Sequence, residues 1–189
     1  LIPLLDEEGD AQAGALAALT GIGDPAIPSL IKTLSDENSA IRLGVAGVLD
    51  RLGWEPADLE EKIAWLIALR RWRDLAEIGG PALEHLVARL GDTDAAVQAA
   101  VMEVLIDIGT PAVLPLVSVL DEDRLGRPAE DVLVQLGYVA VDMLIEALHR
   151  PQIREKAARV LVRIGAPATG ALILALADPD IGDTVAGIL

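Results

Sequence analysis

Three tryptophans and three arginines lie together in one short stretch of the chain, LGWEPADLEEKIAWLIALRRWRDLAEIGG, at residues 52–80. The chain has no other tryptophan and no phenylalanine, and its one tyrosine lies elsewhere. A guanidinium group is attracted to the face of an indole ring. Aromatic and cationic side chains at this density suggest a platform for an acidic or aromatic ligand. The candidate residues of that platform are Trp54, Arg70, Arg71, Trp72 and Arg73.

Other residues give little sign of catalysis or metal binding. Neither His85 nor His149 has a second histidine four residues later, as a helical metal site would need. The chain has no cysteine, which excludes thiol nucleophiles and zinc–thiolate sites. Carboxylate pairs such as Glu60 and Glu61 stand at predicted helix starts, where they stabilise the helix dipole. We therefore expect a protein that is not an enzyme, with no catalytic residue, no metal ligand and no cofactor.

The charge and the apolar runs limit the partners and the location. The formal net charge is −15, and a surface this acidic repels the phosphates of DNA and RNA. The longest apolar runs, such as ALILALA, are far shorter than the ~20 residues of a membrane span. No basic segment followed by an apolar one opens the chain as a signal peptide would. We expect a cytoplasmic protein that binds neither nucleic acid nor membranes.

A repeat positions all of these residues. The segments IGDPAIPSLIKTL, IGGPALEHLVARL, IGTPAVLPLVSVL, LGYVAVDMLIEAL and IGAPATGALILAL begin at residues 22, 78, 108, 136 and 164, and a further LG stands at residue 52. The glycine follows the apolar end of one helix, where the chain turns left-handed. The proline stands in the first turn of the next helix, where its missing N–H costs nothing. Each repeat therefore reads as a first helix, a tight turn and a second helix.

Apolar residues recur at helical spacing in both helices of a repeat, for instance Ile27, Leu30 and Leu34 in a second helix. One such hairpin cannot bury its apolar stripe alone, whereas stacked hairpins bury a continuous core. The sequence therefore predicts an all-α fold: a right-handed α-solenoid, or superhelix, in which the second helices line the concave side. Residues 1–189 are expected to form this single array of about six repeats of about 28–30 residues, with a degenerate repeat at 52–80.

The repeat resembles the HEAT family, and in particular the short PBS-lyase HEAT-like repeats of armadillo type. SDENSAIRLGVAGVLDRLG (residues 35–53) and IGTPAVLPLVSVL carry the resemblance best. The family stacks an Asp of the turn against an Arg of the next helix, and Arg42 and Arg154 stand at that Arg position. The equivalent positions hold Gln12, Gln98, Gly126 and Gly182, so the ladder of stacked pairs is incomplete. The resemblance implies protein–protein scaffolding, with a few enzymatic branches.

Alignment on the repeat favours a structural role for the tryptophan stretch. Trp65 falls at the core position that Leu30 and Leu86 hold in other repeats, and is expected to be buried. The following first helix is short, and large rings fill the gap that a shortened helix leaves. Trp54 and Trp72, beside the arginines, keep the alternative of a ligand platform open.

The spacing of apolar residues in the second helices also predicts which of their positions are exposed. In ten-residue blocks that begin at residues 25, 81, 111, 139 and 167, positions 4, 5 and 8 point away from the core. In the C-terminal half these positions are mostly apolar, and such a surface commonly marks an interaction site. The alternative is that a missing repeat or a neighbouring molecule covers it. The candidate residues for binding a partner segment in this groove are Leu114, Ser118, Asp142, Met143, Glu146 and Leu174.

Lys156, Arg159 and Arg163 form a basic stripe on one helix of this acidic chain. The stripe is either a solvated outer face or a docking site for an acidic neighbouring domain.

The function we expect is a non-enzymatic protein–protein interaction scaffold whose partner is a protein or peptide. The alternative is a ligand-handling lyase or chaperone of the phycobilin-lyase type. The first residues, LIPLL, and the last, DTVAGIL, lack the polar caps of a repeat array. We therefore expect a fragment of a longer chain, or self-association through the uncapped ends.

Overall fold

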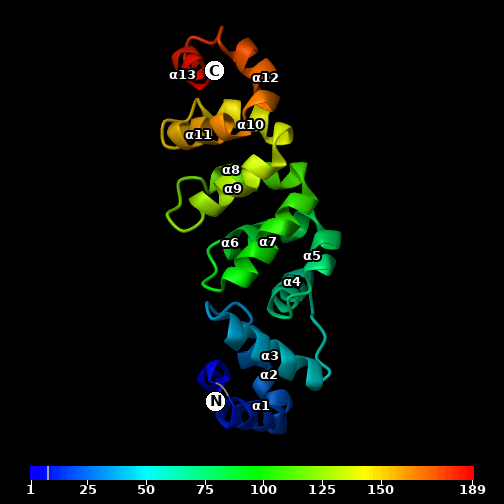
Figure 1. Ribbon diagram of the computed structural model, residues 1–189. Coiled ribbons are helices and arrows are strands. Elements are labelled where there is room, and N and C mark those ends of the chain that lie inside the picture. Colours follow the sequence, from blue (N-terminus) through cyan, green and yellow to red (C-terminus); the bar gives the residue numbers. More distant parts are fainter. Residues whose placement is uncertain (8) are drawn as a thin grey trace. The chain divides into compact units, whose positions relative to one another are not determined.

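The computed structural model describes residues 1–7 and 9–189, and this part of the chain is entirely helical (Figure 1). It contains thirteen α-helices and five short 3-10 helices, without a strand among the described residues. In chain order these elements are η1 (Ile2–Asp6), α1 (Asp10–Ile22), η2 (Asp24–Ala26), α2 (Ile27–Thr33), α3 (Ser39–Arg51), α4 (Leu59–Ala68), α5 (Trp72–Ile78), η3 (Gly80–Ala82), α6 (Leu83–Arg89), α7 (Ala95–Ile108), η4 (Thr110–Ala112), α8 (Val113–Ser118), α9 (Gly126–Leu136), α10 (Tyr138–Ala147), α11 (Arg154–Ile164), η5 (Ala166–Ala168), α12 (Thr169–Ala175) and α13 (Gly182–Ile188). The all-α prediction is confirmed.

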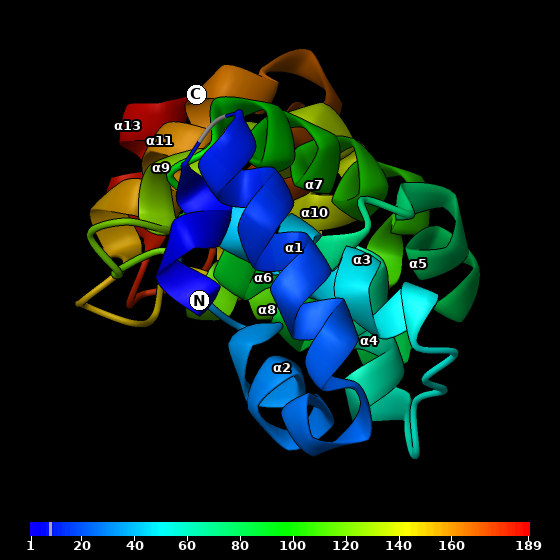
Figure 2. The same cartoon turned by 90° about the horizontal axis from the view of Figure 1, so that it is seen from below.

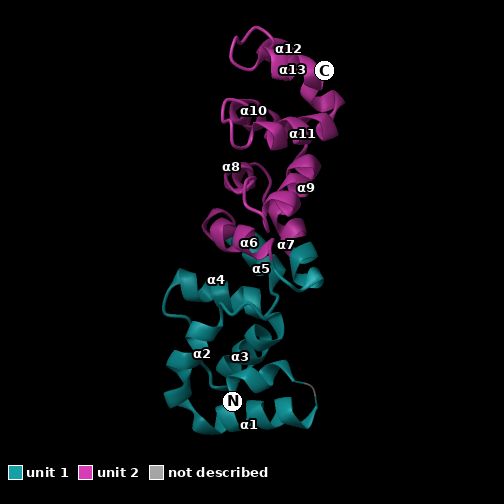
Figure 3. Cartoon of the chain, turned by 90° about the vertical axis from the view of Figure 1, so that its left-hand side faces the viewer, with its two compact units in different colours: residues 1–78, 92–100 teal, residues 79–91, 101–189 magenta. Residues whose placement is uncertain are grey.

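The helices form two compact units (Figure 3). Unit 1 comprises residues 1–78 and 92–100, and unit 2 comprises residues 79–91 and 101–189. The first residues of α7 thus belong to unit 1 and the rest to unit 2.

The predicted turns explain where the helices end. Gly109, for example, follows the last residue of α7 with φ 74°, a left-handed conformation that an L side chain rarely adopts. A 3-10 turn with a proline comes next and leads into α8. The glycines that precede the other second helices share this conformation, at residues 23, 53, 79, 137 and 165.

In unit 1, α1, α2 and α3 lie together (Figure 2) and enclose the first core. Leu5, Leu30 and Leu49 are fully buried there, at 0% exposure. In unit 2, the second helices α6, α8, α10 and α12 pack in a row, each against the next. The first helices α9, α11 and α13 pack likewise as a second layer. The position that was predicted as the core is fully buried in each second helix of unit 2, at Leu86, Leu116, Leu144 and Leu172.

The start of a first helix contacts a backbone carbonyl at the end of the preceding second helix, and different residues make this contact in α11 and α9. Arg154 Nε donates a hydrogen bond to the carbonyl of Leu148, 2.6 Å away. At the equivalent place Gly126 approaches the carbonyl of Leu120 so closely that a Cβ would lie 2.4 Å from the oxygen. The glycines that interrupt the predicted Arg ladder therefore allow direct backbone contact where the arginines form a hydrogen bond.

We expect Gly126→Ala to lower the free energy of unfolding by about 1–3 kcal/mol, since the new methyl group has to displace a backbone carbonyl. Gly170→Ala is the matched control: it also lies in unit 2, its added methyl group meets open space, and it should be neutral or stabilise by up to about 1 kcal/mol. Urea unfolding followed by circular dichroism measures both. Equal stability of the two variants would contradict the close contact at Gly126.

Within the described residues no single helix is both long and apolar enough to cross a membrane, although three sharply bent helix pairs meet the length and composition criteria.

Candidate binding surface

The second helices of unit 2 present exposed apolar side chains on one face. Leu114 on α8 is 54% exposed and Leu174 on α12 is 80% exposed. Both are large aliphatic side chains, which folding normally removes from water. Their predicted exposure is confirmed.

Acidic side chains separate the two leucines. Asp142 and Glu146 lie on α10, which packs between α8 and α12, and both are exposed. Their carboxylates form no ion pair among the described residues, and Met143 beside them is half-buried. Ser118 is exposed, and its hydroxyl donates a hydrogen bond to the carbonyl of Pro115 within the same helix. We call Leu114, Ser118, Asp142, Met143, Glu146 and Leu174 the α8–α10–α12 face.

The residues of this face hold matching positions in their sequence blocks. Leu114 and Asp142 hold position 4 of their ten-residue blocks, whereas Glu146 and Leu174 hold position 8. On α10, Asp142 therefore holds the block position of Leu114, and Glu146 holds that of Leu174.

The basic stripe on α11 is neutralised within unit 2. Arg163 Nη2 lies 2.7 Å from Asp131 Oδ1, and Arg159 Nη1 lies 3.2 Å from Glu130 Oε1. Lys156 Nζ lies 3.0 Å from Asp121 Oδ1. Asp131 and Glu130 lie on the neighbouring helix α9. The basic stripe therefore gives no support to the docking of an acidic neighbouring domain, because its charges are already paired with carboxylates of this chain.

The arginines of the tryptophan stretch do not form one platform. Arg71 pairs with Asp74, and Arg73 Nε lies 3.6 Å from Glu77 Oε1 on the same short helix. Arg70, the one non-glycine residue with positive φ among the described residues, pairs instead with Asp94 of the turn before α7. Each of the three guanidinium groups therefore forms an ion pair with a different carboxylate.

The indoles serve packing, but one residue away from the predicted register. Trp54 and Trp65 meet edge to face, with ring centroids 6.2 Å apart, and pack against the core of unit 1. Trp65 and Trp72 are only half-buried, whereas Leu66 is 2% exposed. The prediction that Trp65 holds the core position is therefore wrong, and Leu66 holds it.

This shift in register has a local cause. The insertion WEPAD separates Gly53 from α4, so the glycine no longer sets where the helix begins. Asp58 is the N-cap of α4: its carboxylate accepts a hydrogen bond from the amide of Glu61 at 2.9 Å. The apolar side chains that follow this cap, Ile63, Leu66 and Ile67, form the buried side of α4.

Two turns that are far apart in the chain meet in unit 1. Arg42 near the start of α3 is 1% exposed, and its Nη2 lies 2.5 Å from Oδ2 of Asp92 in the turn before α7. Ser39 Oγ donates a hydrogen bond to Asp94 Oδ2 at 2.8 Å, the same oxygen that Arg70 contacts at 2.8 Å. We call Ser39, Arg42, Asp92 and Asp94 the α3–α7 clasp. These polar contacts join the start of α3 to the turn before α7 within unit 1.

Asp94 is held in its ionised form. The hydrogen bond from Ser39, first of all, and then the amide of Ala96 lower the pKa of the Asp94 carboxyl below its ordinary value. The amide of Val97 and the charge of Arg70 act in the same direction. The carboxylate therefore both begins α7 and joins it to α3.

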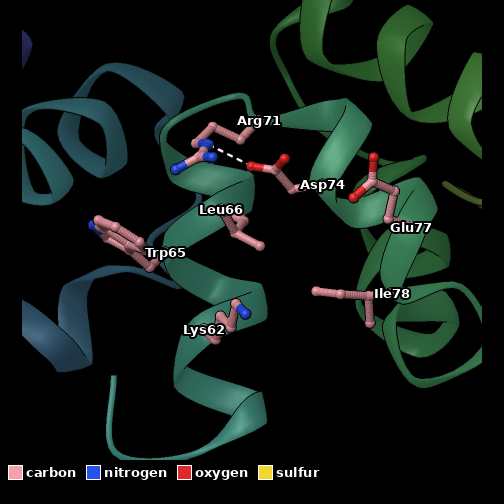
Figure 4. Close-up of a pocket in the computed structure, with 7 residues that line it drawn as sticks. All are labelled: Lys62, Trp65, Leu66, Arg71, Asp74, Glu77 and Ile78. Carbon is pink, nitrogen blue, oxygen red and sulfur yellow. Dashed lines mark ion pairs between the residues drawn. The ribbon is translucent and has the colours of Figure 1, made fainter. Parts of the chain in front are cut away.

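A hollow of about 400 Å³ lies between α4 and α5 (Figure 4). Leu66 and Ile78 contribute apolar surface to it, while Lys62, Arg71, Asp74 and Glu77 bring charges of both signs. Of the predicted platform only Arg71 lines this hollow, joined by Trp65, which points away from α5 in Figure 4. The mixture of charges selects no single ligand class.

His149 follows α10, and its ring nitrogen Nδ1 lies 3.3 Å from the carbonyl oxygen of Glu146. His149 Nε2 lies 3.1 Å from Asp178 Oδ2, and this hydrogen bond raises the pKa of the imidazole above its ordinary value. Among the described residues, no three His, Asp or Glu side chains gather as metal ligands would.

The comparisons with known proteins do not assign the chain to a family. No protein-family model matches the sequence, and a search of curated proteins finds no significant match.

Proposed function

We propose that this protein is a non-enzymatic interaction scaffold, which binds a segment of another protein on the α8–α10–α12 face. The observation that supports this most directly is the exposure of Leu114 and Leu174, at 54% and 80%, on helices that flank α10. Exposed apolar surface beside polar groups on a folded protein commonly marks an interaction site. The unpaired carboxylates of Asp142 and Glu146 add a preference for a partner with a positive charge.

The order of helices supports a repeat scaffold of this kind. First and second helices alternate along unit 2, and each second helix packs against the next. We propose that the hairpins stack as a right-handed solenoid of HEAT-like repeats, with second helices on its concave side. Such arrays commonly present an extended concave surface to their partners.

A random peptide library displayed on phage tests this function without knowledge of the natural partner. The intact chain is the bait, and enriched peptides are measured individually against Leu114→Glu/Leu174→Glu. We expect peptides whose binding is at least tenfold weaker to this variant, because each Glu places a charge where an apolar group must dock.

The matched control is Leu59→Glu/Val162→Glu, which changes two other exposed apolar residues, at 46% and 55% exposure. Both variants should keep the helicity and melting temperature of the parent chain, since none of the four side chains is buried. If every enriched peptide binds both variants as well as the parent, the α8–α10–α12 face is not the binding site.

A further inference from the structure

We infer that the segment accepted by the α8–α10–α12 face is an amphipathic α-helix of about four turns, with apolar residues at positions i and i+14 and a Lys or Arg at i+7. This inference rests on the proposed function and adds the chemistry and spacing of the partner.

The distance between the two leucines follows from their places in the repeat. Packed helices lie about 8–10 Å apart, so two steps from α8 to α12 span up to about 20 Å. Leu174 stands four positions further along its block than Leu114, which adds an offset of about 6 Å along the helix axis. The diagonal between the two side chains is therefore about 17–21 Å, with α10 at its midpoint.

A helix matches this diagonal. Seven residues advance an α-helix by about 10.5 Å and return the side chain to nearly the same face, and fourteen residues advance it by about 21 Å. An extended strand at about 3.3 Å per residue would reach the midpoint after about three residues, where its side chain points away from the surface. Only the helical partner brings all three contacts to one side.

The midpoint residue must be basic. The diagonal passes between Asp142 and Glu146, which are four residues apart on α10, exposed, and without an ion pair among the described residues. A Lys or Arg at i+7 has one carboxylate on each side. Half-buried Met143, next to Asp142, gives its aliphatic stem an apolar contact.

Four synthetic peptides of eighteen residues test the inference. The matched peptide carries Leu, Lys and Leu at positions 2, 9 and 16 in a helix-forming background of Ala, Gln and Glu. The spacing peptide moves the same three residues to positions 2, 7 and 12. The charge peptide replaces Lys with Glu, and the broken peptide has a central proline. Binding to the intact chain is measured by fluorescence anisotropy at two salt concentrations.

We expect the matched peptide to bind at least tenfold more tightly than each of the other three. Asp142→Asn/Glu146→Gln should weaken its binding and reduce its salt dependence, because the attraction between the peptide lysine and the two carboxylates is lost. Both substitutions keep size and exposure, so a loss of folding does not explain the effect. The inference is overturned if the spacing or broken peptide binds as tightly, or if the neutral variant binds unchanged.

The library experiment separates this inference from the proposed function. If enriched peptides depend on Leu114 and Leu174 yet lack the i, i+7, i+14 pattern, the face binds proteins but this helical register is wrong. If no enriched peptide depends on those leucines, both proposals fail.

Discussion

Replacing Arg42 with methionine is expected to lower the free energy of unfolding by about 3–5 kcal/mol. The Asp92 side chain is 0% exposed, so the variant leaves a buried carboxylate without its guanidinium. The carbonyls of Asp36 and Glu37 also lose the hydrogen bonds that Arg42 Nη1 donates at 2.7 and 2.9 Å. Urea unfolding followed by circular dichroism, with the midpoint and slope both fitted, measures the loss.

Two further variants separate the buried charge from a general disturbance. Arg70→Met removes a pair whose side chains are 38% and 26% exposed, and should cost at most about 1 kcal/mol. Arg42→Met/Asp92→Leu removes both buried charges and should recover much of the loss. A double variant as unstable as Arg42→Met, or an Arg70→Met loss of similar size, would show that the buried ion pair is not the cause.

The second large effect is expected at Leu66. Leu66→Ala should lower the free energy of unfolding by about 2–5 kcal/mol, because the side chain is 2% exposed and its removal leaves a cavity in unit 1. Trp65→Leu, at the neighbouring half-buried position, should cost less than about 1.5 kcal/mol, chiefly through the lost edge-to-face contact with Trp54. Thermal and urea unfolding measure both. A larger loss of stability for Trp65→Leu than for Leu66→Ala would show that Trp65, and not Leu66, holds the core position.

Much of the fold was predictable because its signals are local. A left-handed glycine such as Gly109, a proline two residues later and the helical spacing of apolar residues each act within a few positions. The exposure of Leu114 and Leu174 followed from the same spacing, since it fixes which side of each helix faces the core.

The prediction of which residues of α4 face the core was wrong, because the Gly-x-Pro-Ala turn that marks the start of other second helices is absent there. WEPAD replaces the Gly-x-Pro-Ala turn, so counting from neighbouring repeats placed Trp65 where Leu66 belongs. The cap at Asp58 and the apolar Ile63, Leu66 and Ile67 were the better guide.

The contacts of the α3–α7 clasp could not be predicted from the sequence for a different reason. Arg42 was recognised as the residue that meets an acidic turn, but its partner lies fifty residues further along the chain. The pairing depends on how α3 and the turn before α7 come together in the fold, which no local pattern around Arg42 specifies.

The α3–α7 clasp also bears on the order in which the chain acquires its structure during synthesis. Unit 1 is discontinuous: residues 92–100 complete it only after residues 79–91, which belong to unit 2, have been made. A nascent chain that ends at Ile78 has α3 with its Arg42 but neither Asp92 nor Asp94. Contacts between segments this distant in sequence slow folding, because a long loop must close before they form. The N-terminal helices are therefore synthesised before Asp92 and Asp94, which contact α3. After Ile78, about fourteen to sixteen further residues must be added before these contacts can form.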